Sequence, residues 1–131
     1  MILRFTPLFF DAQSYNRGNT RRALGDKQGA IADYDQAIRL NPKDAEAYNN
    51  RGVTRRALGD NQGAIADYEE AIRLAPKDAA AYVNRGNIRS QLEDKQGAII
   101  DLQTAASLYR SQGNESMYRK VLNALQQINR R

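Results

Sequence analysis

The sequence repeats itself every 34 residues, and this period restricts the fold more than any other feature of the chain. Residues 11–44 align without gaps on residues 45–78 and are identical to them at 24 of 34 positions. Residues 79–112 match the second copy at 16 of 34 positions. A unit of this length buries its apolar face only against a neighbouring copy, so the chain is expected to form an array of three units.

Each copy predicts two helices joined by a turn. In the second copy, Gly59 and Asp60 separate two segments whose apolar residues recur at helical spacing. Gly59 can adopt the left-handed backbone that ends a helix, and Asp60 can cap the helix that follows. Pro76 prevents the second helix from continuing, and Asp78 can cap the first helix of the next copy. The expected unit is therefore a helical hairpin.

The composition excludes most common active sites. The 131 residues include 20 Lys and Arg, 15 Asp and Glu, and neither His nor Cys. Without these two residue types the chain cannot build a Ser-His-Asp or Cys-His nucleophile, a thiolate or imidazole zinc site, or a disulfide. No apolar run approaches the ~18 residues of a membrane-spanning helix. We therefore expect a protein that is not an enzyme, holds no metal or cofactor, and resides in the cytoplasm.

The repeats resemble the tetratricopeptide repeat family in its bacterial form, whose pattern of aromatic, small and proline positions recurs here in register. The positions that match the family pattern, and that the resemblance makes structural, are Gly18, Ala30, Tyr34, Tyr48, Gly52, Ala64, Tyr68, Pro76, Tyr82, Gly86 and Ala98. Gly52 opposite Ala64 removes side-chain bulk where two helices would cross. The resemblance implies an all-α fold, a right-handed α-solenoid of three helical hairpins with a C-terminal capping helix.

The chain divides into five predicted segments. They are an apolar N-terminal leader at 1–10, repeats at 11–44, 45–78 and 79–112, and a capping helix at 113–131. In the last segment one helical stripe is apolar and consists of Met117, Val121, Ala124, Leu125 and Ile128. This stripe is expected to cover the last apolar face of the array. The alternative is a detachable amphipathic helix that binds a membrane or a partner.

Two arginines per copy stand where the family usually has Leu and Tyr. They are Arg17, Arg21, Arg51, Arg55, Arg85 and Arg89. One aspartate per copy lies at the edge of the second helix's apolar stripe, at Asp33, Asp67 and Asp101. We predict that these residues form structural ion pairs, with a row of phosphate-binding sites as the alternative.

The resemblance also implies a concave groove that binds extended peptides, lined by the exposed side of each first helix. The residues expected in this peptide groove are Tyr15, Asn16, Asn19, Arg22, Asn49, Asn50, Val53, Arg56, Val83, Asn84 and Asn87. Asn16, Asn50 and Asn84 recur in all three copies, and an amide can both donate to and accept from a peptide backbone. Alternatively, these asparagines make only local hydrogen bonds within the repeats.

Asn19 and Asn50 also match two asparagines of the clamp with which some family members bind acidic C-terminal tails of chaperones. However, Tyr15, Ala80 and Asn84 stand where that clamp has cations. The resemblance therefore argues against that ligand, although Arg22 and Arg56 could attract an acidic segment.

The leader, Met1–Phe10, contains all three phenylalanines of the chain. We expect it to fold over the first hairpin, which has no preceding helix to cover it. The alternative is that it docks on a second molecule and produces a self-associating oligomer.

The leading functional hypothesis is a non-catalytic module that binds a peptide or protein segment of unknown identity. A rival is nucleic-acid binding, because the net charge is +5. The first repeat has six cations and five acids and the second has five and six, whereas residues 114–131 have four cations and one acid. The excess charge therefore lies mostly at the ends, and no repeat offers the positive stripe that phosphate binding uses.

Overall fold

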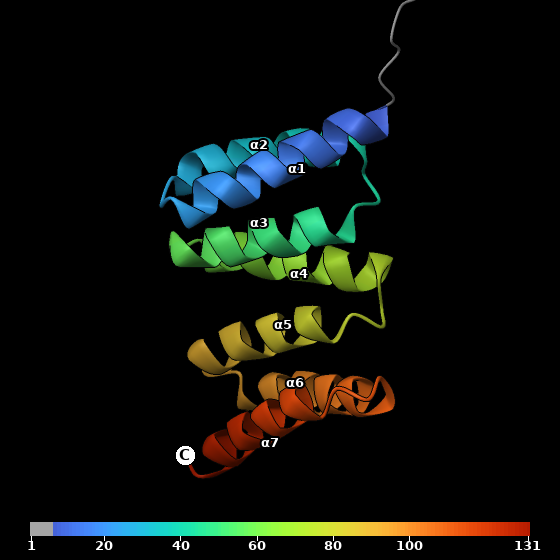
Figure 1. Cartoon of the computed structure of the whole chain (residues 1–131). Helices are drawn as coiled ribbons and strands as arrows, with labels where there is room; N and C mark the ends of the chain where they lie inside the picture. Colours follow the sequence, from blue (N-terminus) through green and yellow to red (C-terminus); the bar gives the residue numbers. More distant parts are fainter. Residues whose placement is uncertain (1–6) are drawn as a thin grey trace, which may run out of the picture. The chain divides into compact units, whose positions relative to one another are not determined.

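The computed structural model describes residues 7–131, which form seven helices and no strand (Figure 1). The chain divides into two compact units, Met1–Leu74 and Ala75–Arg131. The first contains the helices α1 (Pro7–Ala23), α2 (Lys27–Leu40), α3 (Ala45–Ala57) and α4 (Asn61–Leu74). The second contains α5 (Ala79–Gln91), α6 (Lys95–Ser111) and α7 (Glu115–Asn129). The predicted all-α fold is confirmed.

The predicted leader overlaps the first helix, because α1 begins at Pro7. Its first six residues lie outside the described residues, so both expectations for the leader stay predictions, as does the division into repeats. Within residues 7–131, no helix is both long and apolar enough to cross a membrane.

The turns inside the hairpins have the predicted geometry. Gly59 has φ +86, which is the left-handed region, and Asp60 Oδ1 accepts a hydrogen bond from the backbone N–H of Gly63 at 2.9 Å. In the third hairpin, Glu93 replaces the glycine but keeps a positive φ of 66. The left-handed region costs a non-glycine residue about 1–2 kcal/mol, so this turn shape is imposed by the two helices it joins.

Helix lengths follow the prolines. The second helices of repeats one and two end at Leu40 and Leu74, two residues before Pro42 and Pro76. In the third repeat Arg110 replaces the proline, and α6 continues to Ser111.

The two helices of a hairpin approach closely at a glycine. A Cβ atom added at Gly52 would lie 2.7 Å from a ring carbon of Tyr68 and 3.2 Å from the carbonyl oxygen of Ala64. The equivalent Gly86 faces Leu102, where an added Cβ would meet the side chain at 3.2 Å. Tyr68 is fully enclosed, and this burial raises the pKa of its hydroxyl to about 12. Gly52 thus lies where an added side chain would collide with the second helix.

Each hairpin is also held by a buried aspartate that lies between two arginines. Arg51 donates from Nη2 to Asp67 Oδ1 at 2.7 Å and from Nε to Oδ2 at 3.0 Å, while Arg55 Nη1 donates to Oδ2 at 2.9 Å. Asp67 is only 2% exposed. The other repeats place Arg17 and Arg21 around Asp33, and Arg85 and Arg89 around Asp101. The predicted structural ion pairs are confirmed.

The second unit has a continuous apolar core to which α7 contributes. Its buried members from α6 and α7 include Leu102, Ala105, Tyr109, Val121 and Ile128. Met117, Ala124 and Leu125 pack against this core, so the predicted stripe faces α6 as expected. Asn114 caps α7 by accepting a hydrogen bond from the backbone N–H of Met117 at 3.1 Å.

Gly52→Ala is expected to lower the free energy of unfolding by about 1–3 kcal/mol, because the new methyl group overlaps a rigid tyrosine ring. Gly86→Ala is expected to cost less, since the leucine side chain can move away. Urea unfolding followed by far-UV circular dichroism measures both. Equal losses would show that the tyrosine contact does not set the requirement for glycine.

Asp67→Asn is expected to lower the free energy of unfolding by about 2–3 kcal/mol, because it leaves two arginines without their shared buried carboxylate. Asp60→Asn is the matched control. Asp60 Oδ2 is 3.9 Å from Nε of the same Arg55, but the Asp60 side chain is 55% exposed. Asparagine also caps helices, so the free energy of unfolding is expected to change by no more than about 0.5 kcal/mol. Similar losses for the two variants in urea unfolding would contradict a structural role of the buried carboxylate.

Candidate functional site

In the first unit, three predicted groove residues are joined by side-chain hydrogen bonds. Asn50 Nδ2 on α3 donates to Tyr15 Oη at 2.8 Å and to Asn19 Oδ1 at 3.2 Å, both on α1. The Tyr34 hydroxyl on α2 donates to the same Asn19 Oδ1 at 2.5 Å. The rings of Tyr15 and Tyr34 are 6.2 Å apart between centroids. We call these four residues the amide network; it ties α1, α2 and α3 together.

The amide network leaves one donor and one acceptor outside these hydrogen bonds. Asn19 uses only its oxygen in them, so its Nδ2 group stays outside the network. Asn50 uses only its nitrogen, so its Oδ1 also stays outside. A peptide group presents one N–H and one C=O, which are the complementary partners. Both asparagines are half-buried, and their internal bonds hold them in fixed orientations.

The surroundings of the amide network keep its two tyrosines neutral. The charged residues of this region include two arginines and one glutamate. Burial raises the pKa of Tyr15, and the carboxylate of Glu46 raises it further. Burial also raises the pKa of Tyr34, although the guanidinium of Arg22 acts against this shift. Arg22 and Arg56 occupy equivalent positions in the two repeats, and both are half-buried. An acidic ligand would therefore meet two cations on this face.

The second unit has a small cavity of about 230 Å³ between α5, α6 and α7. Its lining consists of Val83, Asn87, Leu102, Met117, Lys120, Val121 and Ala124. Most of these side chains are apolar, and Asn87 and Lys120 supply the polar groups. The cavity can accept an apolar side chain whose neighbouring groups are polar or negatively charged.

In the first unit hydrogen bonds join Tyr15, Asn19 and Asn50, and in the second unit Val83 and Asn87 line the same cavity. Half-buried positions in the first unit are Tyr15, Asn19, Arg22, Asn49, Asn50, Val53 and Arg56, and in the second unit Val83, Asn84 and Asn87. Asn16 is exposed, whereas its sequence equivalents Asn50 and Asn84 are half-buried. Identical residues at one repeat position therefore have different surroundings.

The sequence explains why the amide network does not recur in the same form. Asn49 and Val53 occupy the second-repeat positions that correspond to Tyr15 and Asn19. Valine has no side-chain acceptor, so the central hydrogen bond cannot form there.

The sequence pattern did not predict the contribution of α7 to a cavity. Lys120 is a charged residue outside the predicted apolar stripe, yet it lines the cavity together with Val83 and Asn87 of α5. Its spacing of three residues from Met117 and four from Ala124 was the available signal, since residues at this spacing lie side by side on a helix.

Comparison with known proteins places these features in a family. A family model described as tetratricopeptide repeat matches residues 15–78 and 54–113. No curated protein sequence gives a significant match.

Solved structures share the fold at low sequence identity. The TPR2B domain of yeast Sti1, in complex with pHsp70, is 22% identical with a TM-score of 0.88, covering 92% of this chain and 97% of that domain. The first TPR of Spaghetti (RPAP3), bound to the HSP90 peptide SRMEEVD, is 22% identical with a TM-score of 0.85, covering 95% and 94%. The translocator chaperone SycD from Yersinia enterocolitica is 17% identical with a TM-score of 0.88, covering 96% and 87%.

The family model covers well over half of the residues, and the matched region contains helical hairpins. The chain belongs to the tetratricopeptide repeat family.

Proposed function

We propose that this chain is a non-catalytic binding module for extended peptide or protein segments. The first unit would bind such a segment on the exposed sides of α1 and α3, and the second unit would bind one on the exposed side of α5. The amide network carries this proposal. Asn19 and Asn50 are fixed by internal hydrogen bonds, yet one donor and one acceptor lie outside the network. A site of this kind binds a peptide backbone without first having to order its own side chains.

The preferred segment is acidic and contains at least one apolar side chain. Arg22 and Arg56 supply positive charge in the first unit, and Lys120 supplies it in the second. In the second unit, an apolar side chain of a bound segment would enter the cavity lined by Val83 and Met117. The peptides bound by the Sti1 and Spaghetti domains make a peptide ligand a reasonable analogy. Tyr15 stands in place of a clamp cation, so a different acidic sequence is expected.

The arginines that suggested nucleic-acid binding are engaged elsewhere. In each repeat, two of them contact one buried aspartate: Arg17 and Arg21 at Asp33, Arg51 and Arg55 at Asp67, and Arg85 and Arg89 at Asp101. A guanidinium that is paired with a carboxylate is a weaker phosphate ligand. Peptide binding is therefore the function that the side chains support best, and a cytoplasmic location is part of this proposal.

The test selects ligands from phage-displayed random peptides with the full chain as bait, and then titrates synthetic copies by fluorescence anisotropy. Acidic peptides with an apolar residue are expected. Asn50→Ala removes the residue that orients Asn19, and Val83→Glu puts a negative charge into the cavity. Each variant is expected to weaken binding about tenfold or more.

Arg73→Gln is the matched control, because Arg73 lies on α4 and, within residues 7–131, forms an ion pair only with Glu70. It should bind the selected peptides as the unmodified chain does. Circular dichroism checks that each variant is folded. If the selected peptides bind the Asn50→Ala and Val83→Glu variants with unchanged affinity, the proposed site is wrong.

A further inference from the structure

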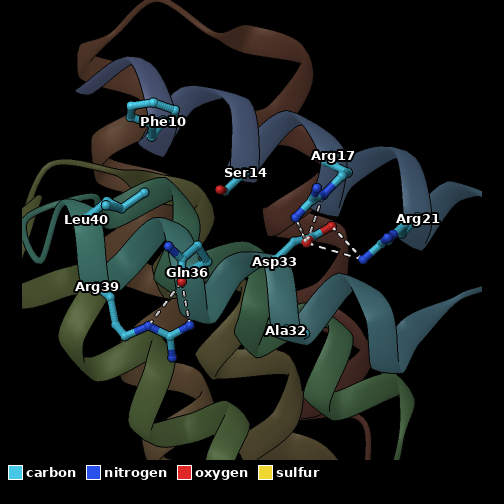
Figure 2. Close-up of a pocket in the computed structure, with 9 residues that line it drawn as sticks. All are labelled: Phe10, Ser14, Arg17, Arg21, Ala32, Asp33, Gln36, Arg39 and Leu40. Carbon is cyan, nitrogen blue, oxygen red and sulfur yellow. Dashed lines mark hydrogen bonds and ion pairs between the residues drawn. The ribbon is translucent and has the colours of Figure 1, made fainter. Parts of the chain in front are cut away.

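A larger cavity of about 550 Å³ lies between α1 and α2 in the first repeat (Figure 2). It is lined by Phe10, Ser14, Arg17, Arg21, Ala32, Asp33, Gln36, Arg39 and Leu40. The four lining residues from α1 are spaced by three or four positions, so they form one face of that helix. Tyr15 and Asn19 are on a different face, so this cavity is separate from the amide network.

A serine lines the cavity where the other two repeats have an aromatic residue. Ser14 occupies the repeat position of Tyr48 in the second repeat and of Tyr82 in the third. The guanidinium of Arg51 lies over the ring of Tyr48, with 5.3 Å from Cζ to the ring centroid, and Arg85 lies over Tyr82 at 5.9 Å. Ser14, at the corresponding position, offers Arg17 no such ring. Repeats two and three thus indicate that an aromatic ring suits this position.

A carboxylate is the second group that the first repeat lacks. In the second repeat, Arg51 Nη1 donates to Asp35 Oδ1 of α2, the preceding helix, at 2.7 Å. The position that corresponds to Asp35, one repeat earlier, is Met1, which has no acidic side chain. The Arg51 side chain is 15% exposed, whereas that of Arg17 is 60% exposed.

In the described part of the first repeat, only one oxygen of the buried aspartate accepts hydrogen bonds. Arg17 donates from both Nε and Nη2 to the same oxygen, Asp33 Oδ1, at 3.0 and 2.8 Å. The other oxygen, Oδ2, is buried without a hydrogen bond and has Arg21 Nη1 at 3.2 Å as its ion-pair contact. In the second repeat, both oxygens of Asp67 accept hydrogen bonds from Arg51.

We propose that this cavity is a second binding site, which takes a partner segment presenting an aromatic side chain beside a carboxylate. The ring would stack on the guanidinium of Arg17, as Tyr48 does on Arg51. The carboxylate would accept from Arg17 Nη1, as Asp35 does from Arg51 Nη1. Three arginines and one aspartate line the cavity, so its net charge is positive and favours an acidic segment.

The charges point to a partner protein rather than to this chain itself. Residues 1–6 contain Phe5, but their one charged side chain is Arg4. The exposed side of α7 in a second copy would bring Arg119 and Lys120, while the only acid of residues 114–131 is Glu115. Neither segment complements a positive cavity, whereas an acidic segment with an aromatic residue does.

The test uses the full chain labelled with ¹⁵N and the probe peptide acetyl-Glu-Tyr-Asp-Leu-amide. The Nε–Hε signals of Arg17 and Arg21 are followed by NMR during titration, and they are expected to shift in a saturable manner. Acetyl-Gln-Tyr-Asn-Leu-amide, which lacks the carboxylates, is expected to bind about tenfold more weakly. Acetyl-Glu-Ala-Asp-Leu-amide, which lacks the ring, is expected to bind several-fold more weakly.

Three variants test the location. Ser14→Tyr restores the ring of the other repeats and is expected to abolish binding by filling the cavity. Arg39→Gln keeps the cavity but removes a cation, so binding should weaken several-fold even if Ser14→Tyr is poorly folded. Arg73→Gln changes the equivalent residue of the second repeat and should leave the affinity unchanged.

Equal affinity for the charged and the uncharged peptide would overturn the proposal, as would undiminished binding by Ser14→Tyr. If the peptide binds only after Phe5→Ala, the leader itself fills the cavity and the assignment to a partner is wrong. Asn50→Ala should not affect this titration, because Asn50 is not among the residues lining the cavity. Failure of this site is thus distinguishable from failure of the proposed peptide site.

Discussion

A buried carboxylate held by two guanidinium groups is the interaction on which each hairpin depends. A charge removed from water is costly unless it is paired and hydrogen-bonded, and Asp67 meets this condition only while Arg51 and Arg55 lie against it. The pairing fixes the rotation of the first helix relative to the second. It also directs both arginines to the side away from the amide network, so the two faces of the first helix carry different chemistry.

This division of faces places the two proposed binding sites on different sides of α1. On one face of α1, Tyr15 and Asn19 contact α3 through Asn50 and leave amide groups outside the network. On another face, Arg17 pairs with Asp33, and the position that corresponds to Asp35 one repeat earlier is Met1, which has no carboxylate. Arg17 is therefore more exposed than Arg51, its equivalent in the second repeat. At the other end of the chain, α7 covers the core of the second unit and also lines a cavity.

Repeat identity is a good guide to backbone structure and a poor guide to side-chain roles. Copies one and two share 24 of 34 residues, have the same turns and caps, and pair equivalent arginines with equivalent aspartates. The few substitutions have large local effects. Serine at position 14, where the second repeat has tyrosine, lines a cavity, and valine in place of asparagine at position 53 prevents a second copy of the amide network.

The sequence by itself determined the all-α fold, the helix ends at Gly59 and Asp60, the longer α6, the capping stripe and the pairing of arginines with aspartates. These features depend on local backbone preferences and on a fixed 34-residue spacing, both of which are visible in one dimension. Only the tertiary structure decided that Asn50 bonds to Tyr15 and Asn19 while Asn16 is exposed, that Lys120 lines a cavity, and that a cavity adjoins Ser14. Each of these depends on which side chains from distant segments come within a few ångströms, and a repeat pattern does not encode that distance.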